Sequence, residues 1–327
     1  MAASASDTTT IQYPISIDGD NIYCDEAKLK DHMTRKLNFN ENDAAVILQQ
    51  ITGHIKYGLY NFWYLAPEEL GTEAIRVLLH SVEHSQLIRM LSYQDGYWYT
   101  ALHWCADNKN NEVIKVILDS VSEDECYQLL SITGTWGQTS LHRSCLRGDT
   151  ESVKVMLNHI NQDMRYSLLQ MTSNASNTPL HFASYNSHID VIKVIHESVT
   201  QFQWINLLQM KGDEEMKVLQ TAAYRSTQSS IDTIRDSVSD KEWIQLLSTP
   251  LPEYKESIHS SEDFYQRAVS RIDELRAEAR VKCALLTQDK SGIYCRRVKR
   301  MNLYCAVVGS GLRGTRVHFR QAALKKF

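Results

Sequence analysis

Apolar and polar positions along the chain recur with a period of 39 residues. Residues 100–103 read TALH, 139–142 read TSLH, 178–181 read TPLH, and 217–220 read KVLQ at the next step. Each motif is followed, at a constant distance, by an apolar run and then by a pair of large apolar residues, usually Leu-Leu. A fixed period of this size predicts a stack of similar units that bury a continuous core between them.

Each unit is expected to form three helices. The Thr that opens a motif is a helix N-cap, since its hydroxyl accepts from a backbone N–H that lacks a partner. The apolar run places Ile114, Ile117, Leu118 and Val121 on one helical face. Residues 122–125, Ser-Glu-Asp-Glu, fit a capping box that starts a short third helix. The expected fold is therefore all-α, a helical solenoid of about five units at 57–95, 96–134, 135–173, 174–212 and 213–251.

The motif at 178–183, TPLHFA, resembles the signature of the ankyrin repeat family, and Gly137 and Gly148 stand where that family carries Gly. The resemblance covers residues 57–251 and implies a non-catalytic stack with an extended surface for partners and no cofactor. The period is longer than the usual ~33 residues, which we assign to the third helix. The outer units depart from the motif at Asn61, Tyr64, Lys217 and Gln220. These units either cap the stack or are decayed repeats that fray.

The segments that flank the repeats carry weaker patterns. Residues 1–40 are expected to be flexible, and 41–56 to form a helix that caps the stack at its N-terminal end. Residues 262–286 predict one long helix, which either packs on the last repeat or self-associates as a short coiled coil. From Gln288 to the last residue there are ten Lys or Arg and one acid, a net charge of +9.

This basic tail, 288–327, has two interpretations. A basic run attracts nucleic acid or an anionic membrane surface, and it also serves as a nuclear address. The alternative is a disordered, solvated end of the chain. Seven Cys, an odd number without framework spacing, indicate a reducing compartment. No stretch reaches the ~18 apolar residues of a membrane span, and the polar start lacks a signal pattern. A cytoplasmic address is expected, with a nuclear one as the alternative.

Three sequence features point to chemistry and are set aside. Residues 309–314, GSGLRG, fit the dinucleotide fingerprint, but that site needs a following helix and a later acid, and no acid follows Gly314. The neighbouring pairs His103 with Cys105 and His142 with Cys145 match no common zinc spacing. The repeat explains them instead, with His bonded to backbone at a unit junction and Cys in a small-residue position. We therefore expect no catalytic residue, metal or cofactor.

The residues expected to contact a partner lie on the turn tips and on the exposed side of each first helix, which together form the concave surface of such solenoids. Trp, Tyr and Arg often dominate protein interfaces. The candidates are Tyr97, Trp98, Trp104, Trp136, Arg143, Phe182 and Tyr185. The alternative is that some of these rings pack against the neighbouring turn. The sequence thus predicts an intracellular adaptor that binds a protein or peptide; the alternative is a tether to nucleic acid or anionic membrane through the basic tail, with the repeats as spacer.

Overall fold

The computed structural model describes residues 12–17, 20–25, 30–36, 40–55, 71–225, 228–252 and 262–288. The start of the first repeat, with Asn61 and Tyr64, lies outside the described residues, as do residues 289–327 with the glycine-rich motif at 309–314. The chain divides into two compact units, Met1–Asp273 and Glu274–Phe327. The first unit contains the repeats.

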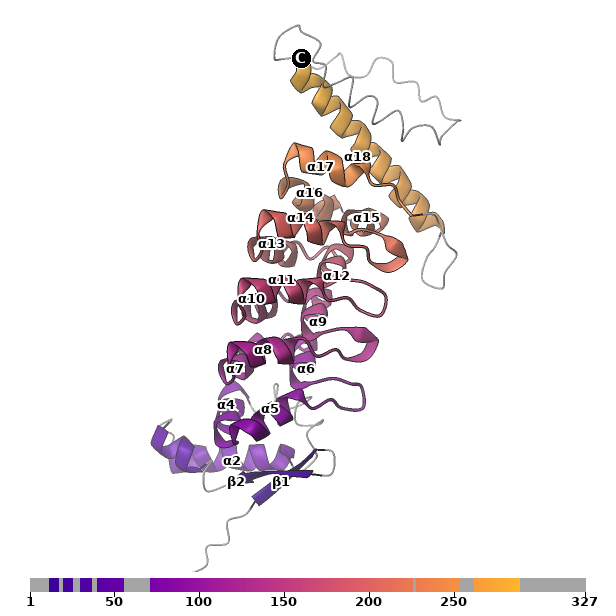
Figure 1. The fold of residues 1–327 in the computed structure, drawn as a ribbon. Coiled ribbons are helices and arrows are strands. Elements are labelled where there is room, and N and C mark those ends of the chain that lie inside the picture. Colours follow the sequence, from indigo (N-terminus) through magenta and orange to yellow (C-terminus); the bar gives the residue numbers. More distant parts are fainter. Residues whose placement is uncertain are drawn as a thin grey trace, which may run out of the picture. The chain divides into compact units, whose positions relative to one another are not determined.

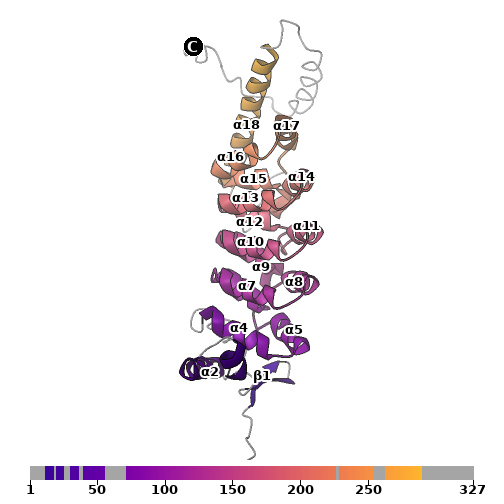
Figure 2. The same cartoon turned by 90° about the vertical axis from the view of Figure 1, so that its left-hand side faces the viewer.

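Three columns of helices build the repeat region, one column for each helix of the predicted unit (Figures 1 and 2). The first helices are α6 (Ala101–Asp107), α9 (Ser140–Arg147), α12 (Pro179–Tyr185) and α15 (Val218–Tyr224). The second helices are α4 (Gly71–Ser81), α7 (Asn111–Asp119), α10 (Thr150–Asn158), α13 (Ile189–Glu197) and α16 (Gln228–Asp236). The third helices are α5 (His84–Ser92), α8 (Glu123–Leu130), α11 (Gln162–Gln170), α14 (Gln201–Gln209) and α17 (Asp240–Ser248).

Within each column a helix packs against its equivalent in the next repeat, such as α6 on α9, α7 on α10 and α8 on α11. The motif leucines Leu102, Leu141, Leu180 and Leu219 occupy equivalent buried positions. Buried Cys105 and Cys145 provide small side chains where the first helices meet. The predicted helical solenoid is confirmed, and equivalent residues of successive repeats fall into rows along it.

Local capping explains where these helices begin and end. Thr100, Thr139 and Thr178 are the N-caps of the first helices, and the predicted capping box at Ser122 is present. Gly148 ends α9 in the left-handed region, at a φ of 68°, and a Cβ there would lie 2.4 Å from the His188 ring. Only glycine adopts that conformation without cost and leaves this space.

The N-terminal segment 1–40, which the sequence pattern predicted to be flexible, contains regular elements that this pattern did not predict. Strand β1 (Gln12–Ile17) pairs antiparallel with β2 (Asp20–Asp25), from Gln12↔Asp25 to Ile17↔Asp20. A π-helical turn, η1 (His32–Lys36), and helix α2 (Glu41–Ile55) follow. Helix α2 packs against α4 of the first repeat. The helical repeats thus carry a small two-stranded addition.

The long helix α18 (Glu262–Gln288) begins in the repeat unit and continues beyond it. Its first turns bind the last repeat: the Tyr265 hydroxyl donates to the Pro252 carbonyl at 2.6 Å, and Arg271 donates to the Gln228 side chain. Ala268 and Ile272 are buried. Packing of the helix start on the last repeat is therefore confirmed, and self-association of the helix stays a prediction.

Candidate functional site

A row of hairpin loops runs along one edge of the repeat unit, each loop joining a third helix to the first helix of the next repeat (Figure 1). One backbone bond closes each loop at the same phase of the repeat. The closing pairs are Asp95 N–H to Tyr99 O (3.0 Å), Gly134 to Gln138 (2.7 Å), Ser173 to Asn177 (2.9 Å) and Gly212 to Met216 (2.8 Å). The loops together with the four first helices are called the loop face below.

Neighbouring hairpin loops are also bonded to each other. The Gln94 side chain donates to the Thr133 carbonyl at 2.9 Å, and the Asn174 N–H donates to the Trp136 carbonyl at 2.8 Å. The Asp213 N–H donates to the Asn177 side chain at 2.9 Å. Because each loop is tied to the next, the row presents its tips on a connected backbone.

Two tryptophans stand at the tips of adjacent loops with most of their surface exposed. Trp98 is 65% exposed and Trp136 is 68% exposed, and Tyr97 beside Trp98 is also exposed. Both tryptophans adopt left-handed backbone conformations, with φ of 60° and 66°. A bulky residue in that region costs about 1–2 kcal/mol. Burial of the rings does not offset this cost, because the rings face solvent.

Trp104 packs against the first of these loops and is partly buried. Its indole N–H donates to the Asp95 carboxylate at 2.7 Å, and its ring meets the edges of Tyr97 and Tyr99 at centroid distances of 6.2 and 5.1 Å. Trp104 therefore holds the loop that displays Trp98, and part of its ring packs against the turn.

Arg143 is held inside the junction between the second and third repeats. Its guanidinium donates to both oxygens of Asp107, at 2.9 and 2.7 Å, and to the Gln138 side chain at 3.1 Å. It also lies 5.5 Å from the ring centroid of Tyr99, and its side chain is only 13% exposed. Arg147 adds a contact to Asp107 at 3.1 Å. Arg143 is thus bound within the stack, whereas the sequence pattern predicted that it contacts a partner.

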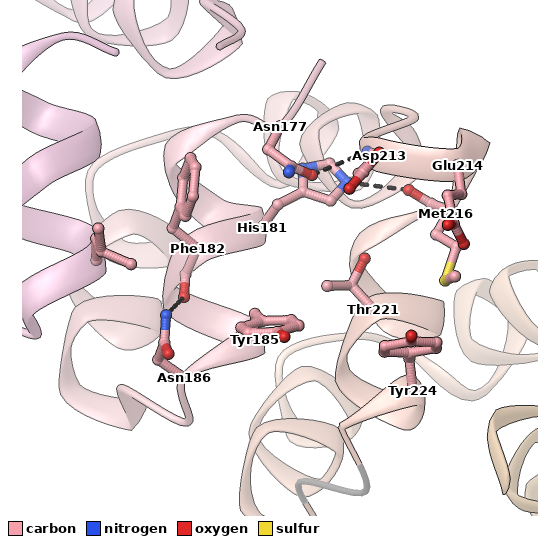
Figure 3. A pocket seen from close by; sticks show the side chains of 11 residues that line it. Asn177, His181, Phe182, Tyr185, Asn186, Asp213, Glu214, Met216, Thr221 and Tyr224 are labelled. Atoms are coloured by element: carbon pink, nitrogen blue, oxygen red, sulfur yellow. Dashed lines mark hydrogen bonds between the residues drawn. The ribbon is translucent and has the colours of Figure 1, made fainter. Parts of the chain in front are cut away.

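Phe182 and Tyr185 lie on α12, two repeats further on from Trp104. Phe182 is half-buried and meets the edge of His142 at 5.9 Å, and the Arg225 guanidinium lies 4.5 Å from the Tyr185 ring centroid. Both rings line a pocket of about 210 Å³ between the fourth and fifth repeats (Figure 3). The other lining residues are Leu146, Asn177, His181, Asn186, Asp213, Glu214, Met216, Thr221 and Tyr224.

The buried motif histidines fix the hairpin loops to the first helices. In each of three repeats the ring Nδ1 accepts from the Thr N–H at 3.2 Å, so Nε2 carries the proton. That Nε2–H then donates to a carbonyl in the next loop. The three pairs are His103 to Gln138 (3.0 Å), His142 to Asn177 (3.2 Å) and His181 to Met216 (3.2 Å). The predicted backbone bond at the unit junction is confirmed.

These histidines are neutral in the folded protein. Burial lowers the pKa of His103, His142 and His181 to about 4. In the fifth repeat Gln220 takes the same position and donates to the Pro250 carbonyl at 2.9 Å. The departure of that repeat from the motif therefore preserves the bond across the junction.

The residues that complete these arrangements were not predicted from the sequence. Asp107 bonds Arg143 although the two residues are 36 positions apart in the sequence, a separation that no motif predicts. Asp213 and Glu214 bring carboxylates to the pocket, and Tyr224 brings a third ring. Glu214 has the repeat phase of Trp136, and this shared phase is the sequence signal that places it on the same surface.

In the part of the chain that the structure describes, no group of three or more His, Cys, Asp or Glu is arranged to hold a metal ion. Burial raises the pKa of the Cys105 and Cys126 thiols to about 12, so they are not thiolates at neutral pH. None of the described helices has both the length and the apolar content needed to span a bilayer.

Comparison with known proteins adds one finding. A family model described as "Ankyrin repeats (3 copies)" matches residues 102–203. No curated protein is similar enough to count as a match. The matched segment includes the three motif histidines, Trp136 and Phe182, whereas Trp98 lies just before it.

Proposed function

Because residues 102–203 match a model of ankyrin repeats, which generally mediate protein–protein interaction, we propose that this chain is a non-catalytic adaptor. It binds a protein or peptide partner along the loop face. Fold alone does not assign a task, so the proposal depends on what this particular face presents.

The observation that carries the proposal is the state of Trp98 and Trp136. Each ring is about two-thirds exposed, and each residue adopts a left-handed backbone conformation. Neither feature stabilises the folded chain. Strained residues that the surrounding structure nevertheless holds in place are found at binding sites, and Trp is the residue type most enriched among interface hot spots.

Rigidity of the loop row supports the same function. Trp104 braces one loop through Asp95, and the Asn174–Trp136 backbone bond ties two loops together. A surface that is ordered before binding loses less conformational entropy when the partner arrives. An extended peptide laid along the tips would meet Tyr97, Trp98 and Trp136 in succession.

The experiment compares Trp98→Gly and Trp136→Gly with a matched control, Phe202→Ser. Phe202 is 76% exposed on the third helix α14, away from the loop face. Random peptides are selected against the full chain, and their dissociation constants are measured for each variant. We expect a 30-fold or greater loss for the tryptophan variants, from a hot-spot contribution of roughly 2 kcal/mol or more. The control should bind normally. A loss confined to Phe202→Ser would move the site to the third helices.

The alternative function, a tether through the basic tail, is favoured only by the charge of residues 288–327. Electrostatic attachment to DNA or anionic vesicles weakens steeply with salt. Deleting 288–327 should then abolish retention on either matrix, and unchanged retention would remove this alternative.

We also propose that the protein works inside the cell. Three buried free thiols, Cys105, Cys126 and Cys145, support a reducing compartment.

A further inference from the structure

The pocket between the fourth and fifth repeats is a gap at a position that other junctions fill. The repeat phase that holds Arg143 in the third repeat holds Phe182 in the fourth and Thr221 in the fifth. Arg143 fills its own junction with a guanidinium bound to Asp107. Phe182 fills the next with a ring against His142. Thr221 is too short to do either, and about 210 Å³ is left open.

The walls of this pocket combine aromatic rings with carboxylates. Phe182, Tyr185 and Tyr224 contribute rings, and Asp213 and Glu214 contribute acids from the adjoining loop. Figure 3 shows Tyr185 and Tyr224 on one side of Thr221 and the two acidic residues on the other. Aromatic faces attract cations through their quadrupole. Carboxylates form short, strong hydrogen bonds with a guanidinium.

The cations nearby are placed outside the pocket lining. Lys211 contacts Glu215 at 3.0 Å, and the Lys217 ammonium donates to Thr249 at 3.2 Å. The Arg225 guanidinium lies over Tyr185, 4.5 Å from its ring centroid, which shows that this ring accommodates a guanidinium. None of the three lines the pocket. Two carboxylates therefore dominate the charge of the lining.

We propose that this pocket binds an arginine side chain of the partner peptide, which takes the place that Arg143 takes at its own junction. The inference rests on the proposed function, because the arginine is part of the peptide that lies along the loop face. Arginine fits better than lysine, since a planar guanidinium stacks on a ring and bonds a carboxylate through two N–H groups at once.

The test titrates the full chain with three capped amino acids: N-acetyl-arginine methylamide, its lysine counterpart and its norleucine counterpart. Binding is followed by NMR through the methyl group of Met216, which lines the pocket. We expect the arginine probe to bind at least five-fold more tightly than norleucine and more tightly than lysine. Equal binding of norleucine and arginine would overturn the proposal, since a purely apolar pocket would explain it.

Variants of the lining sharpen the result. Asp213→Asn with Glu214→Gln should weaken the arginine probe at least five-fold, whereas Glu215→Gln, which changes a carboxylate outside the lining, should leave it unchanged. Thr221→Arg should block the probe by filling the gap from within. If the double variant does not fold, the Thr221→Arg variant alone provides the test. Undiminished binding of the arginine probe to this variant would contradict the proposal that the probe binds in the pocket.

The selected peptides separate this proposal from the function on which it rests. Peptides that need Trp98 and Trp136 but bind normally to Thr221→Arg and to the carboxylate variant would retain the adaptor function and refute the arginine pocket. Conversely, an arginine probe that shifts Met216 while the tryptophan variants bind peptides normally would support the pocket and refute the loop tips as the main site.

Discussion

The junction between repeats two and three differs from the junction between repeats four and five at one position of the repeat, the one held by Arg143 and Thr221 respectively. Both are held by a motif histidine that donates to the next loop, His103 at 3.0 Å and His181 at 3.2 Å. In the first, Arg143 and Asp107 close the space between the first helices. In the second, Thr221 leaves a pocket.

The difference separates the residues that build the stack from those that give it a specific surface. The histidine bond recurs because the buried Nε2–H of each motif histidine needs an acceptor, which the loop carbonyl provides, and an unsatisfied buried donor is costly. The phase of Arg143, Phe182 and Thr221 has no such requirement, so it varies from repeat to repeat. Stability resides in the repeated part, and we expect recognition to reside in the variable part.

Acidification should produce the largest effect and should break both junctions together. The folded-state pKa of His103, His142 and His181 is about 4, below the unfolded value near 6.5. The unfolded chain therefore takes up more protons, and stability is full above pH 6.5 and falls as the pH drops toward 4. Each histidine contributes a slope of about 1.4 kcal/mol per pH unit. Urea unfolding at several pH values measures the slope.

The matched variant for this pH test is His142→Gln, which copies Gln220 of the fifth repeat. It should fold, and between pH 6.5 and 5 its free energy of unfolding should change less steeply with pH, by the equivalent of about one bound proton. A free energy of unfolding that stays constant over that range in the unmodified chain would show that the histidines are not the acid-sensitive element.

Disrupting only the junction that Arg143 and Asp107 close, between repeats two and three, should have the next largest effect on the free energy of unfolding. Asp107→Leu leaves the mostly buried Arg143 without its carboxylate, and loss of one partner of a buried pair costs roughly 3 kcal/mol. The double variant Asp107→Leu/Arg143→Phe installs the residues that Leu146 and Phe182 provide at the next junction. It should recover most of the loss in the free energy of unfolding. A double variant no more stable than the single one would mean that the junctions are not interchangeable.

Relieving strain at a loop tip should have a smaller effect of opposite sign. Trp136→Gly removes an exposed ring from a left-handed position, so we expect stability to rise by about 0.5–1 kcal/mol. Trp136→Ala keeps a Cβ at the same φ and serves as the control, with no gain expected. Thermal unfolding compares the two. A glycine variant less stable than the alanine variant would mean that the ring stabilises the folded chain.

The smallest effect on stability is expected for Arg147, the more exposed of the two arginines that contact Asp107. Arg147 reaches Asp107 at 3.1 Å, but its side chain is 48% exposed. Exposed ion pairs contribute little, so Arg147→Ala should lower the free energy of unfolding by no more than about 0.5 kcal/mol. A loss in urea unfolding as large as that of Asp107→Leu would show that Arg147, and not Arg143, is the main partner of Asp107.

The sequence predicted those parts of the fold that repeat. Thr100, His103 and Leu102 have counterparts at each step of 39 residues, so their roles as cap, loop donor and core residue followed from the pattern. The hairpin of β1 and β2 occurs once and has no second copy against which to compare its residues. Periodicity gave no information there.

The site was predicted less completely, for a related reason. Repeat phase identified Tyr97 and Trp136 as surface residues, with Trp98 next to Tyr97, and all three are exposed. The phase shared by Trp104 and Arg143 suggested that Arg143 faces a partner, but whether its side chain can do so depends on what lies across the junction, and Asp107 was not part of any motif. The pocket arises from a short side chain, Thr221, and its consequence is visible only in three dimensions.

Hydrogen–deuterium exchange with and without a selected arginine-containing peptide tests the location of the binding face most directly. The account predicts slower exchange in the loops at 94–100, 133–139 and 211–217, with little change in the second helices α7, α10 and α13. Protection confined to the second or third helices, or to residues 288–327, would contradict it.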